Sequence, residues 1–458
     1  MKTRNLYKGF CLAVLAITSI GLTSCKDEPD KYEVAGGTPT VNYIRCLSSE
    51  IQNYNDEADT HYTNGELVES ASPQAILCLV GSNLRSVYEL YFNDQQAVLN
   101  SSYITDNTLI VQVPRSVPDL VTDKIYMVTQ GGETVEYTFH VDIPAPSITS
   151  MSCEYAKPGS TATLYGDYIV NDPNTPLEIL FPNGQAVTDI KVNDNRTSVT
   201  FTVPECTEQG PLTVTSVYGT STTSFYYLDS RGLMFDFDGV TGLSMHGWHN
   251  NLAIQNENGI TGNYVQLGNG EAVINGDGSK WDDAHFSFEY WPGNWDPSAG
   301  YPKGEQKLTD FADFSKWENM AYKFEMYVPT TSPWSSNAMQ IIAGGIDLIS
   351  GGQAGVDADG NTVAGANNTY ISNDAIPRAL YRPWADTGSF DTNDEWITVT
   401  IPIKSSFIYG YSGAAATGTI SGEEFFTSLT LFVCGGGVAG TDCAPIIRID
   451  NIRAVPYK

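Results

Sequence analysis

The sequence predicts an all-β protein that consists of three β-sandwich domains in series. Short runs of alternating apolar and polar residues, separated by turn residues, follow one another along most of the chain. The order of these runs repeats once within residues 38–229. Residues 230–458 show no helical periodicity of any length and hold all eight tryptophans, so we expect a third, aromatic-rich sandwich there.

The chain begins with a segment typical of a secretory signal. Three basic residues precede an apolar run over residues 10–22, which is too short to span a bilayer. The run leads into the sequence LTSC, which resembles the lipobox of bacterial lipoproteins. This resemblance implies that residues 1–24 are removed and that Cys25 carries a lipid anchor. An ordinary cleaved signal that leaves Cys25 free is the alternative.

Residues 25–37 are rich in charge and end in glycine, so they are expected to form a flexible tether. The sequence KDE directly after Cys25 resembles the acidic signal that sends Bacteroidetes lipoproteins to the outer face of the outer membrane. No later segment has the length and apolarity of a membrane helix. We therefore expect a surface-exposed lipoprotein of the cell outer membrane, attached through lipid.

The chain is strongly acidic. Its formal net charge is −29, and removal of residues 1–24, which hold three basic and no acidic residues, would make it −32. A field of this sign repels nucleic acid and anionic lipopolysaccharide. A neutral polysaccharide suits it as a ligand, whereas a polyanionic glycan suits it poorly. No cofactor is expected.

Six cysteines follow Cys25, two in each predicted domain: Cys46 and Cys78, Cys153 and Cys206, Cys434 and Cys443. In an oxidising exterior this distribution favours one disulfide per domain, above all between the last pair, which flanks a Gly-rich loop. In an anaerobe the thiols would stay reduced. No pair has the CxxC spacing, so a metal or nucleophilic role is not expected.

Residues 38–144 and 145–229 are predicted to form two related modules. The first holds strand-like runs at 75–84, 87–98, 108–119 and 124–141, and the second repeats this order up to residue 228. The runs ending in GSNL and VQVP resemble those of IPT/TIG immunoglobulin-like domains, which implies two tandem Ig-like sandwiches. Neither module carries an obvious site, so both are interpreted as spacers joined by a stiff, Pro-containing linker.

Residues 230–458 alternate cleanly at both ends and in two central runs, 320–329 and 396–403. Tyr327 and Trp396 fall on the face opposite the apolar one. The pattern is similar to that of jelly-roll carbohydrate-binding modules, which implies a β-sandwich whose first and last strands pair at its edge. In the last strand, Ile447, Ile449 and Asn451 are expected on one face.

Three polar loops of this domain place a tryptophan beside Pro or Gly, which restricts the backbone and holds the ring ready for a ligand. Indole rings suit the apolar faces of a pyranose as well as a core. The candidate glycan-binding residues are Trp291, Trp295, Trp334, Tyr381 and Trp384. Trp291 is expected on the non-core face of a strand over 285–291. Glu289, Asn294 and Gln340 are candidate polar groups for hydrogen bonds to sugar hydroxyls. Trp281 and Trp317 are expected to cover the ends of the sandwich.

Catalytic and metal sites find little support. A glycosidase needs two carboxylates facing each other across the scissile bond, and the carboxylates that can be placed on strands occur singly. His246 and His249 lack the HExxH spacing of a zinc enzyme. The sequence DADGN at 357–361 resembles half of a calcium loop but lacks the distal Glu, so a turn is favoured.

The lipoprotein signal, the two IPT/TIG-like modules and the Trp-rich end together resemble the surface glycan-binding proteins of Bacteroidetes polysaccharide utilisation loci. The last domain looks like the xyloglucan-binding domain of the B type. This resemblance implies a non-catalytic protein that captures xyloglucan, or else mixed-linkage or β-1,3-glucan. The resemblance also implies that the protein acts together with a SusC/SusD-like transporter complex and a surface endo-glucanase. A protein-binding adhesin and a glycoside hydrolase are the alternatives.

Overall fold

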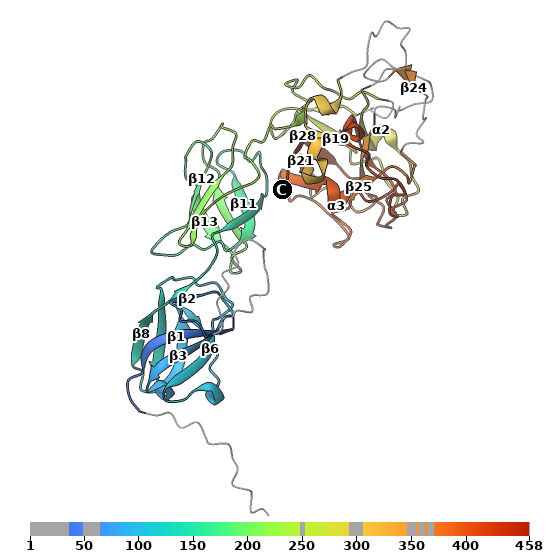
Figure 1. Ribbon diagram of the computed structural model, residues 1–458. Coiled ribbons are helices and arrows are strands. Elements are labelled where there is room, and N and C mark those ends of the chain that lie inside the picture. Colours follow the sequence, from blue (N-terminus) through green and yellow to red (C-terminus); the bar gives the residue numbers. More distant parts are fainter. Residues whose placement is uncertain are drawn as a thin grey trace, which may run out of the picture. The chain divides into compact units, whose positions relative to one another are not determined.

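The computed structural model describes residues 36–48, 65–247, 252–292, 306–345, 355–356, 362–363 and 371–457. The chain forms two compact units, Met1–Ile143 and Pro144–Lys458 (Figure 1). The predicted signal, Cys25 and most of the tether lie outside the described residues. Within these residues no helix is both long and apolar enough to cross a membrane.

The described part of the first unit is a small sandwich of two antiparallel sheets. One sheet has the order β1 (Thr40–Ser48), β3 (Ile76–Ser82) and β6 (Thr108–Gln112). The other has the order β5 (Gln95–Gln96), β4 (Val87–Phe92), β7 (Lys124–Thr129) and β8 (Thr134–Thr138). Alternate residues such as Leu77, Leu90 and Met127 are fully buried, as period-two patterning requires. Short β2 (Ser70–Ala71) and β9 (His140–Val141) pair in parallel.

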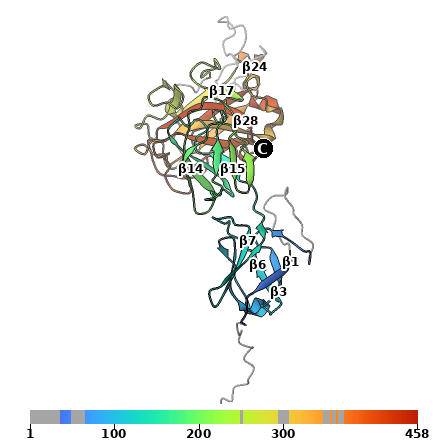
Figure 2. The ribbon, with the colours of Figure 1, turned by 90° about the vertical axis from the view of Figure 1, so that its left-hand side faces the viewer.

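The second unit opens with a module of the same kind. One sheet has the order β10 (Ser147–Met151), β11 (Thr161–Asp167), β14 (Ser198–Thr202) and β13 (Thr188–Val192). The other consists of β12 (Glu178–Leu180), β15 (Thr213–Ser216) and β16 (Gly219–Thr222) (Figure 2 labels β14 and β15). Leu164, Phe201 and Val214 are among the residues of its core.

One glycine marks the repeat in both modules. A Cβ on Gly81 would lie 1.8 Å from the carbonyl oxygen of Thr40, and a Cβ on Gly166 would lie 1.9 Å from that of Ser147. In each case the neighbouring strand has a bulge at this place. Only glycine allows the two backbones to approach so closely, because it has no side chain. Gly81 and Gly166 therefore meet the same steric requirement in the two modules.

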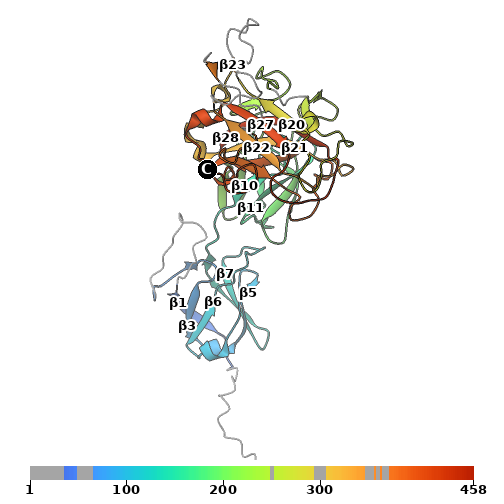
Figure 3. The ribbon, with the colours of Figure 1, turned by 90° about the vertical axis from the view of Figure 1, so that its right-hand side faces the viewer.

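The remaining residues form a larger sandwich (Figure 3). Its six-stranded sheet has the order β18 (Ile254–Gln255), β19 (Tyr264–Leu267), β28 (Ile447–Pro456), β21 (Met320–Tyr327) and β26 (Ile397–Pro402), and β17 (Leu233–Phe235) also pairs with β28. Its four-stranded sheet has the order β20 (Ser287–Tyr290), β27 (Ser428–Val433), β22 (Met339–Gly344) and β25 (Arg378–Tyr381). Short β23 (Gly355–Val356) and β24 (Thr362–Val363) form a separate ladder.

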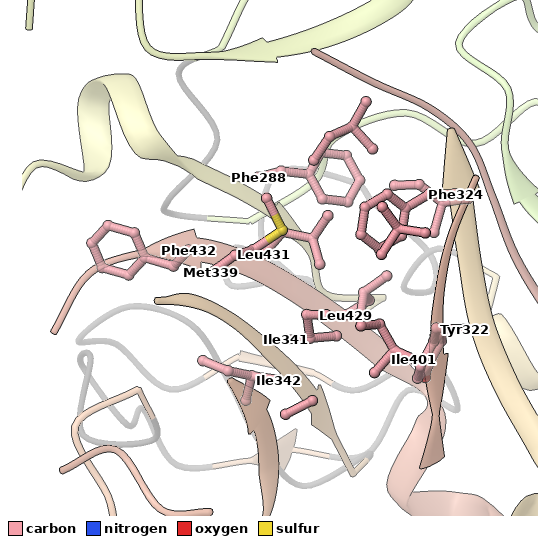
Figure 4. Packing of buried hydrophobic residues seen from close by; sticks show 14 of the residues in the cluster. Phe288, Tyr322, Phe324, Met339, Ile341, Ile342, Ile401, Leu429, Leu431 and Phe432 are labelled. Atoms are coloured by element: carbon pink, nitrogen blue, oxygen red, sulfur yellow. The ribbon is translucent and has the colours of Figure 1, made fainter. Parts of the chain in front are cut away.

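Helices in the described residues are short. They are α2 (Asp283–Phe286), α3 (Ile403–Ser406) and the 3₁₀ turns η1 (Leu84–Ser86), η2 (Ser101–Tyr103), η4 (Leu308–Asp310), η5 (Phe314–Asn319) and η6 (Glu423–Phe426). The all-β prediction is confirmed. The core of the larger sandwich lies between the two sheets, where Phe324 and Ile401 face Phe288, Ile341 and Leu431 (Figure 4).

The predicted pairing of the first and last strands is present, since Leu233 lies opposite Arg453. However, β28 is central in its sheet and not at the edge. A register irregularity with Asn451 at a φ of 50° also reverses its alternation, so that Ile447 and Ile449 are followed inward by Ile452. The expectation that Asn451 shares a face with Ile449 is therefore wrong, because a bulge adds one residue to the count.

The second module and the larger sandwich share a buried contact surface. The Thr398 amide donates to the Ser152 carbonyl at 2.9 Å, and the Glu154 amide donates to the Thr398 hydroxyl at 2.7 Å. Trp396 and Ile260 of the sandwich pack against the core of the module. The module, which is interpreted as a spacer, lies in one compact unit with the domain that follows it.

All six cysteines of the described residues are free thiols. The predicted disulfide between Cys434 and Cys443 is absent, as are the other two. Cys434 lies near the Gln340 amide and Cys443 near the Ser335 amide, so each sulfur has a different polar neighbour. In the first unit, Cys46 lies opposite Leu77 and Cys78 opposite Arg45, so these two side chains point to opposite faces of the sheet.

Candidate functional site

The two sheets of the terminal sandwich differ in what covers their outward faces. On the six-stranded sheet the outward residues Lys323, Glu325 and Arg453 are buried by the second module. Lys323 and Arg453 both bind Glu154 of that module. Because the module occupies this face, the candidate ligand site lies on the side of the four-stranded sheet.

That second face carries two transverse rows of residues. The register places Ser287, Phe432, Gln340 and Leu380 side by side in one row, and Glu289, Thr430, Ile342 and Arg378 in the next. The inward rows between them hold Phe288, Leu431 and Ile341. An outward face that combines carboxylate, hydroxyl, amide and guanidinium groups with a Phe differs from an ordinary apolar contact surface. Apart from the half-buried Leu380, all residues of these two rows are buried, so other segments of the chain cover this face.

Arg378 and Gln340 organise the centre of this face. The guanidinium Nη1 donates to Gln340 Oε1 at 2.8 Å, and Nη2 donates to the Asn373 carbonyl at 2.9 Å. The Gln340 side chain in turn donates to the Cys434 carbonyl at 2.8 Å. The Arg378 and Gln340 side chains are both buried. Arg378 therefore holds the backbone of residues 371–376 over the sheet, because its rigid fork of donors satisfies several carbonyls at once.

Residues 243–247 cover the β20 edge. The His246 amide donates to the Glu289 carbonyl at 3.1 Å, and the Trp291 amide donates to the His246 carbonyl at 2.6 Å. Gly247, with a φ of 155°, crosses so closely that a Cβ would lie 2.3 Å from Glu289 Oε2. A side chain here would thus displace the Glu289 carboxylate.

Trp291 lies on the outward side of its strand, as predicted, but it is 3% exposed. The His246 ring stacks on the indole with centroids 6.3 Å apart and an interplanar angle of 16°. The expectation of an exposed platform residue is wrong for Trp291, because another segment of the chain packs on the same side of the strand. Trp295 and Asn294 lie outside the described residues.

Trp334, Tyr381 and Trp384 are brought together at one end of the four-stranded sheet, but as a buried cluster. Trp334 is 0% and Trp384 2% exposed. The Trp334 indole N–H donates to the Ser336 carbonyl, and that of Trp384 donates to the Asn337 carbonyl at 2.9 Å. The expected exposed positions of these two tryptophans are therefore wrong. Their rings fill the core, and the turn at 336–337 satisfies their polar edges.

Tyr381 is half-buried, with its ring 6.0 Å from that of Trp334. Burial raises the pKa of its phenol. Of the five predicted residues, Tyr381 is the one that the structure describes without full burial.

Trp281 is a candidate that the sequence analysis assigned to structural cover. It is 37% exposed, the highest value among the described tryptophans. The indole lies edge-on to Phe432, with centroids 4.7 Å apart at 83°. Since Phe432 belongs to the outward face, Trp281 extends that face to the surface. The polar loop GDGSKWDD around this residue could have indicated an exposed tryptophan from the sequence. However, it has no Pro next to the tryptophan, as the other candidate loops do.

The described residues contain no group of three or more His, Cys, Asp or Glu side chains that could hold a metal ion. The calcium-like sequence at 357–361 lies outside those residues. His246 places Nδ1 against the Trp291 carbonyl, which fits a positioning role. Among the residues described here, Trp281 presents an exposed indole to a ligand, whereas the polar side chains of the two rows are buried.

Comparisons with known proteins cover both parts of the chain. Residues 227–456 match the family model described as surface glycan-binding protein B xyloglucan binding domain, and residues 68–141 match the IPT/TIG domain. The crystal structure of the surface glycan-binding protein PbSGBP-B from Prevotella bryantii is similar, with 42% identity and a TM-score of 0.78. That match covers 93% of this chain and 100% of the other.

A curated relative, an IPT/TIG domain-containing protein of Bacteroides ovatus, is 26% identical over 237 residues. The match takes in 47% of this chain and 44% of that relative, so the chain spans less than half of the relative's length. The family match and the Prevotella structure both include the terminal sandwich with its outward face. The chain belongs to the surface glycan-binding protein B family.

Proposed function

We propose that this protein captures a neutral plant-type β-glucan at the cell surface without cleaving it. Xyloglucan is the first choice, and mixed-linkage or β-1,3-glucan comes next. The observation that carries the proposal is the family match over 227–456, which coincides with the terminal sandwich and is described by xyloglucan binding. A net charge of −29 agrees with a neutral polymer.

The proposed binding surface is the rim of the four-stranded sheet, where Trp281 is exposed and Tyr381 is half-buried, because the outward face itself is covered. Trp281 would stack on a glucosyl ring, with Trp295 and Tyr381 as further aromatic contacts. Each such contact contributes on the order of 1 kcal/mol beyond area burial. A few of them give weak, rapidly exchanging binding, which becomes strong when many proteins engage one polymer. Polar groups of the rim would select the orientation of the sugar hydroxyls.

Attachment and partners complete the proposal. A lipid on Cys25 would hold the protein at the outer membrane, and residues 25–37 would let it move above the surface. The captured glycan would then pass to a SusC/SusD-like transporter complex, after a surface endo-glucanase has shortened it.

The test is calorimetric titration of the chain from Lys26 onward with xyloglucan, mixed-linkage β-glucan, laminarin and galactomannan, together with an assay for new reducing ends. We expect saturable binding to one β-glucan and no new reducing ends. Trp281→Ala and Trp295→Ala should each weaken binding at least about fivefold, the equivalent of about 1 kcal/mol. Tyr103→Ala, which truncates an exposed ring in the first unit, is the matched control.

Three outcomes would contradict the proposal. Lack of binding to all four polymers would favour a protein-binding role for the same exposed aromatics. New reducing ends would show a hydrolase. Equal affinities in wild type and both tryptophan variants would place the glycan elsewhere on the protein.

A further inference from the structure

A cavity lies within the second unit, between the second module and the terminal sandwich. It is a groove of about 600 Å³. Its walls include Ser150 and Tyr165 from the module and Thr398, Thr400 and Tyr457 from the sandwich. It lies beside β26, an edge strand of the six-stranded sheet, and so does not belong to the face that carries Trp281.

The walls of this groove are held in place. The lining residues Lys323 and Glu154 bind each other across the contact, Arg453 also binds Glu154, and all three side chains are buried. The Thr398 amide donates to the carbonyl of Ser152, the residue that follows β10, at 2.9 Å and ties β26 to the module at one end. A groove between fixed walls is preformed, so a ligand would not have to bear the cost of ordering it.

The lining suits a neutral, hydroxyl-rich ligand. The two charged lining groups, Lys323 and Glu154, pair with each other. Ser150, Ser224 and Thr400 contribute hydroxyls, which can both donate and accept hydrogen bonds. Tyr165 and Tyr457 are 45% and 37% exposed, and each offers a flat apolar ring with a polar tip. Flat apolar faces edged with hydroxyls are the chemistry of carbohydrate. A volume of about 600 Å³ lies in the usual range of small-ligand sites.

We propose that this groove is a second carbohydrate subsite, which binds a short neutral oligosaccharide segment of the captured glycan. The inference rests on the proposed function, because it adds a second contact point for the same class of ligand. Two contact points on one compact unit raise the affinity for a long polymer through effective concentration.

The test uses the chain from Lys26 onward and a xyloglucan heptasaccharide as the probe. In calorimetry the wild type should bind two heptasaccharides, and the double variant Tyr165→Ala/Tyr457→Ala should bind one. Trp281→Ala should lose the other site and keep the groove. Hydrogen exchange should show protection of residues 147–152 and 397–402 by the probe in the wild type but not in the double variant. Tyr165→Phe keeps the ring and should retain the groove site.

Several outcomes would overturn the inference. If the wild type binds one heptasaccharide and the double variant binds it equally well, the groove is not a carbohydrate site, and the proposed function is unaffected. A wild type that binds none overturns the inference for xyloglucan and contradicts xyloglucan as the captured polymer, while the four-polymer titration above decides the proposed function as a whole. Because β10 and β26 are both open edge strands, an extended peptide is the competing occupant. Protection of these strands by a blocked Val/Thr hexapeptide but not by the heptasaccharide would assign the groove to protein.

Discussion

Glu154 of the second module accepts a hydrogen bond from Arg453 Nη2 of the terminal sandwich at 2.8 Å. The two residues are 299 positions apart and both are buried. Arg453 Nη1 also donates to Glu325 Oε2 at 2.8 Å, and Lys323 binds Glu154. Two acids and two bases therefore neutralise each other at this contact, which explains why four charged groups tolerate burial.

Removal of one member of this cluster should destabilise the protein strongly. We expect Glu154→Gln and Arg453→Met each to lower the free energy of unfolding by about 3–5 kcal/mol, because each leaves a buried charge without its partner. The measurement is urea denaturation followed by tryptophan fluorescence, which reports on the terminal sandwich.

Glu318→Gln is the matched control, because Glu318 pairs with Lys404 at 3.0 Å and both side chains are more than half exposed. An exposed pair of this kind contributes about 0–1 kcal/mol. Similar small effects for Glu154→Gln and Glu318→Gln would show that the contact between module and sandwich does not stabilise the unit.

Tryptophan substitutions should separate structural from binding roles. Trp334→Ala and Trp384→Ala remove buried rings and should lower the free energy of unfolding by about 3–5 kcal/mol. Trp281→Ala truncates an exposed ring and should cost less than about 1 kcal/mol, yet weaken glycan binding. Denaturation and titration of the same three preparations give both values. A stable Trp384→Ala variant that has lost only its affinity would contradict the buried assignment.

Asp450 should make stability depend on pH. Burial raises the pKa of its carboxyl to about 7, against the opposing hydrogen bond from Thr261. An unfolded Asp releases its proton near pH 4, so between about pH 4 and 7 the folded state binds more protons. Stability contributed by this group is therefore present at low pH and is lost as the pH rises toward 7.

We expect Asp450→Asn to remove this dependence, since an amide does not ionise. Above pH 7 the variant should be more stable than the wild type by about 2–4 kcal/mol, and at pH 4 the two should be similar. Denaturant titrations at several pH values check this result. Asp277→Asn, at an exposed site, should show no such gain. A variant that is less stable than the wild type at pH 8 would refute the assignment.

The thiols should be reduced and mostly unreactive. In the chain from Lys26 onward all six cysteines should react with Ellman's reagent in denaturant without prior reduction, because none forms a disulfide. In the native protein Cys153 and Cys434 should react slowly, since burial raises the pKa of each thiol and suppresses the thiolate. If two of the six thiols failed to react in denaturant and reacted after treatment with a reductant, the protein would contain a disulfide.

Much of the fold could be predicted from local patterns. Tyr322, Phe324 and Met326 alternate inward along β21, and Tyr327 on the opposite face is half-buried, as period-two patterning required. Gly81 and Gly166 mark the repeated module through a local steric demand. The reversal at Asn451 could not be predicted, because a bulge depends on the partner strand and leaves no composition signal.

The sequence by itself determined the all-β class, the strand runs and the side of each strand on which a tryptophan lies, because these follow from the alternation of neighbouring residues. Only the tertiary structure decided which rings are exposed. His246 covers Trp291, the turn at 336–337 binds the indoles of Trp334 and Trp384, and Glu154 binds the outward charges of the other sheet. Except for the local bond from Trp334 to Ser336, these contacts join segments that lie far apart in the chain. The order of residues within one strand therefore does not show which other segment covers it.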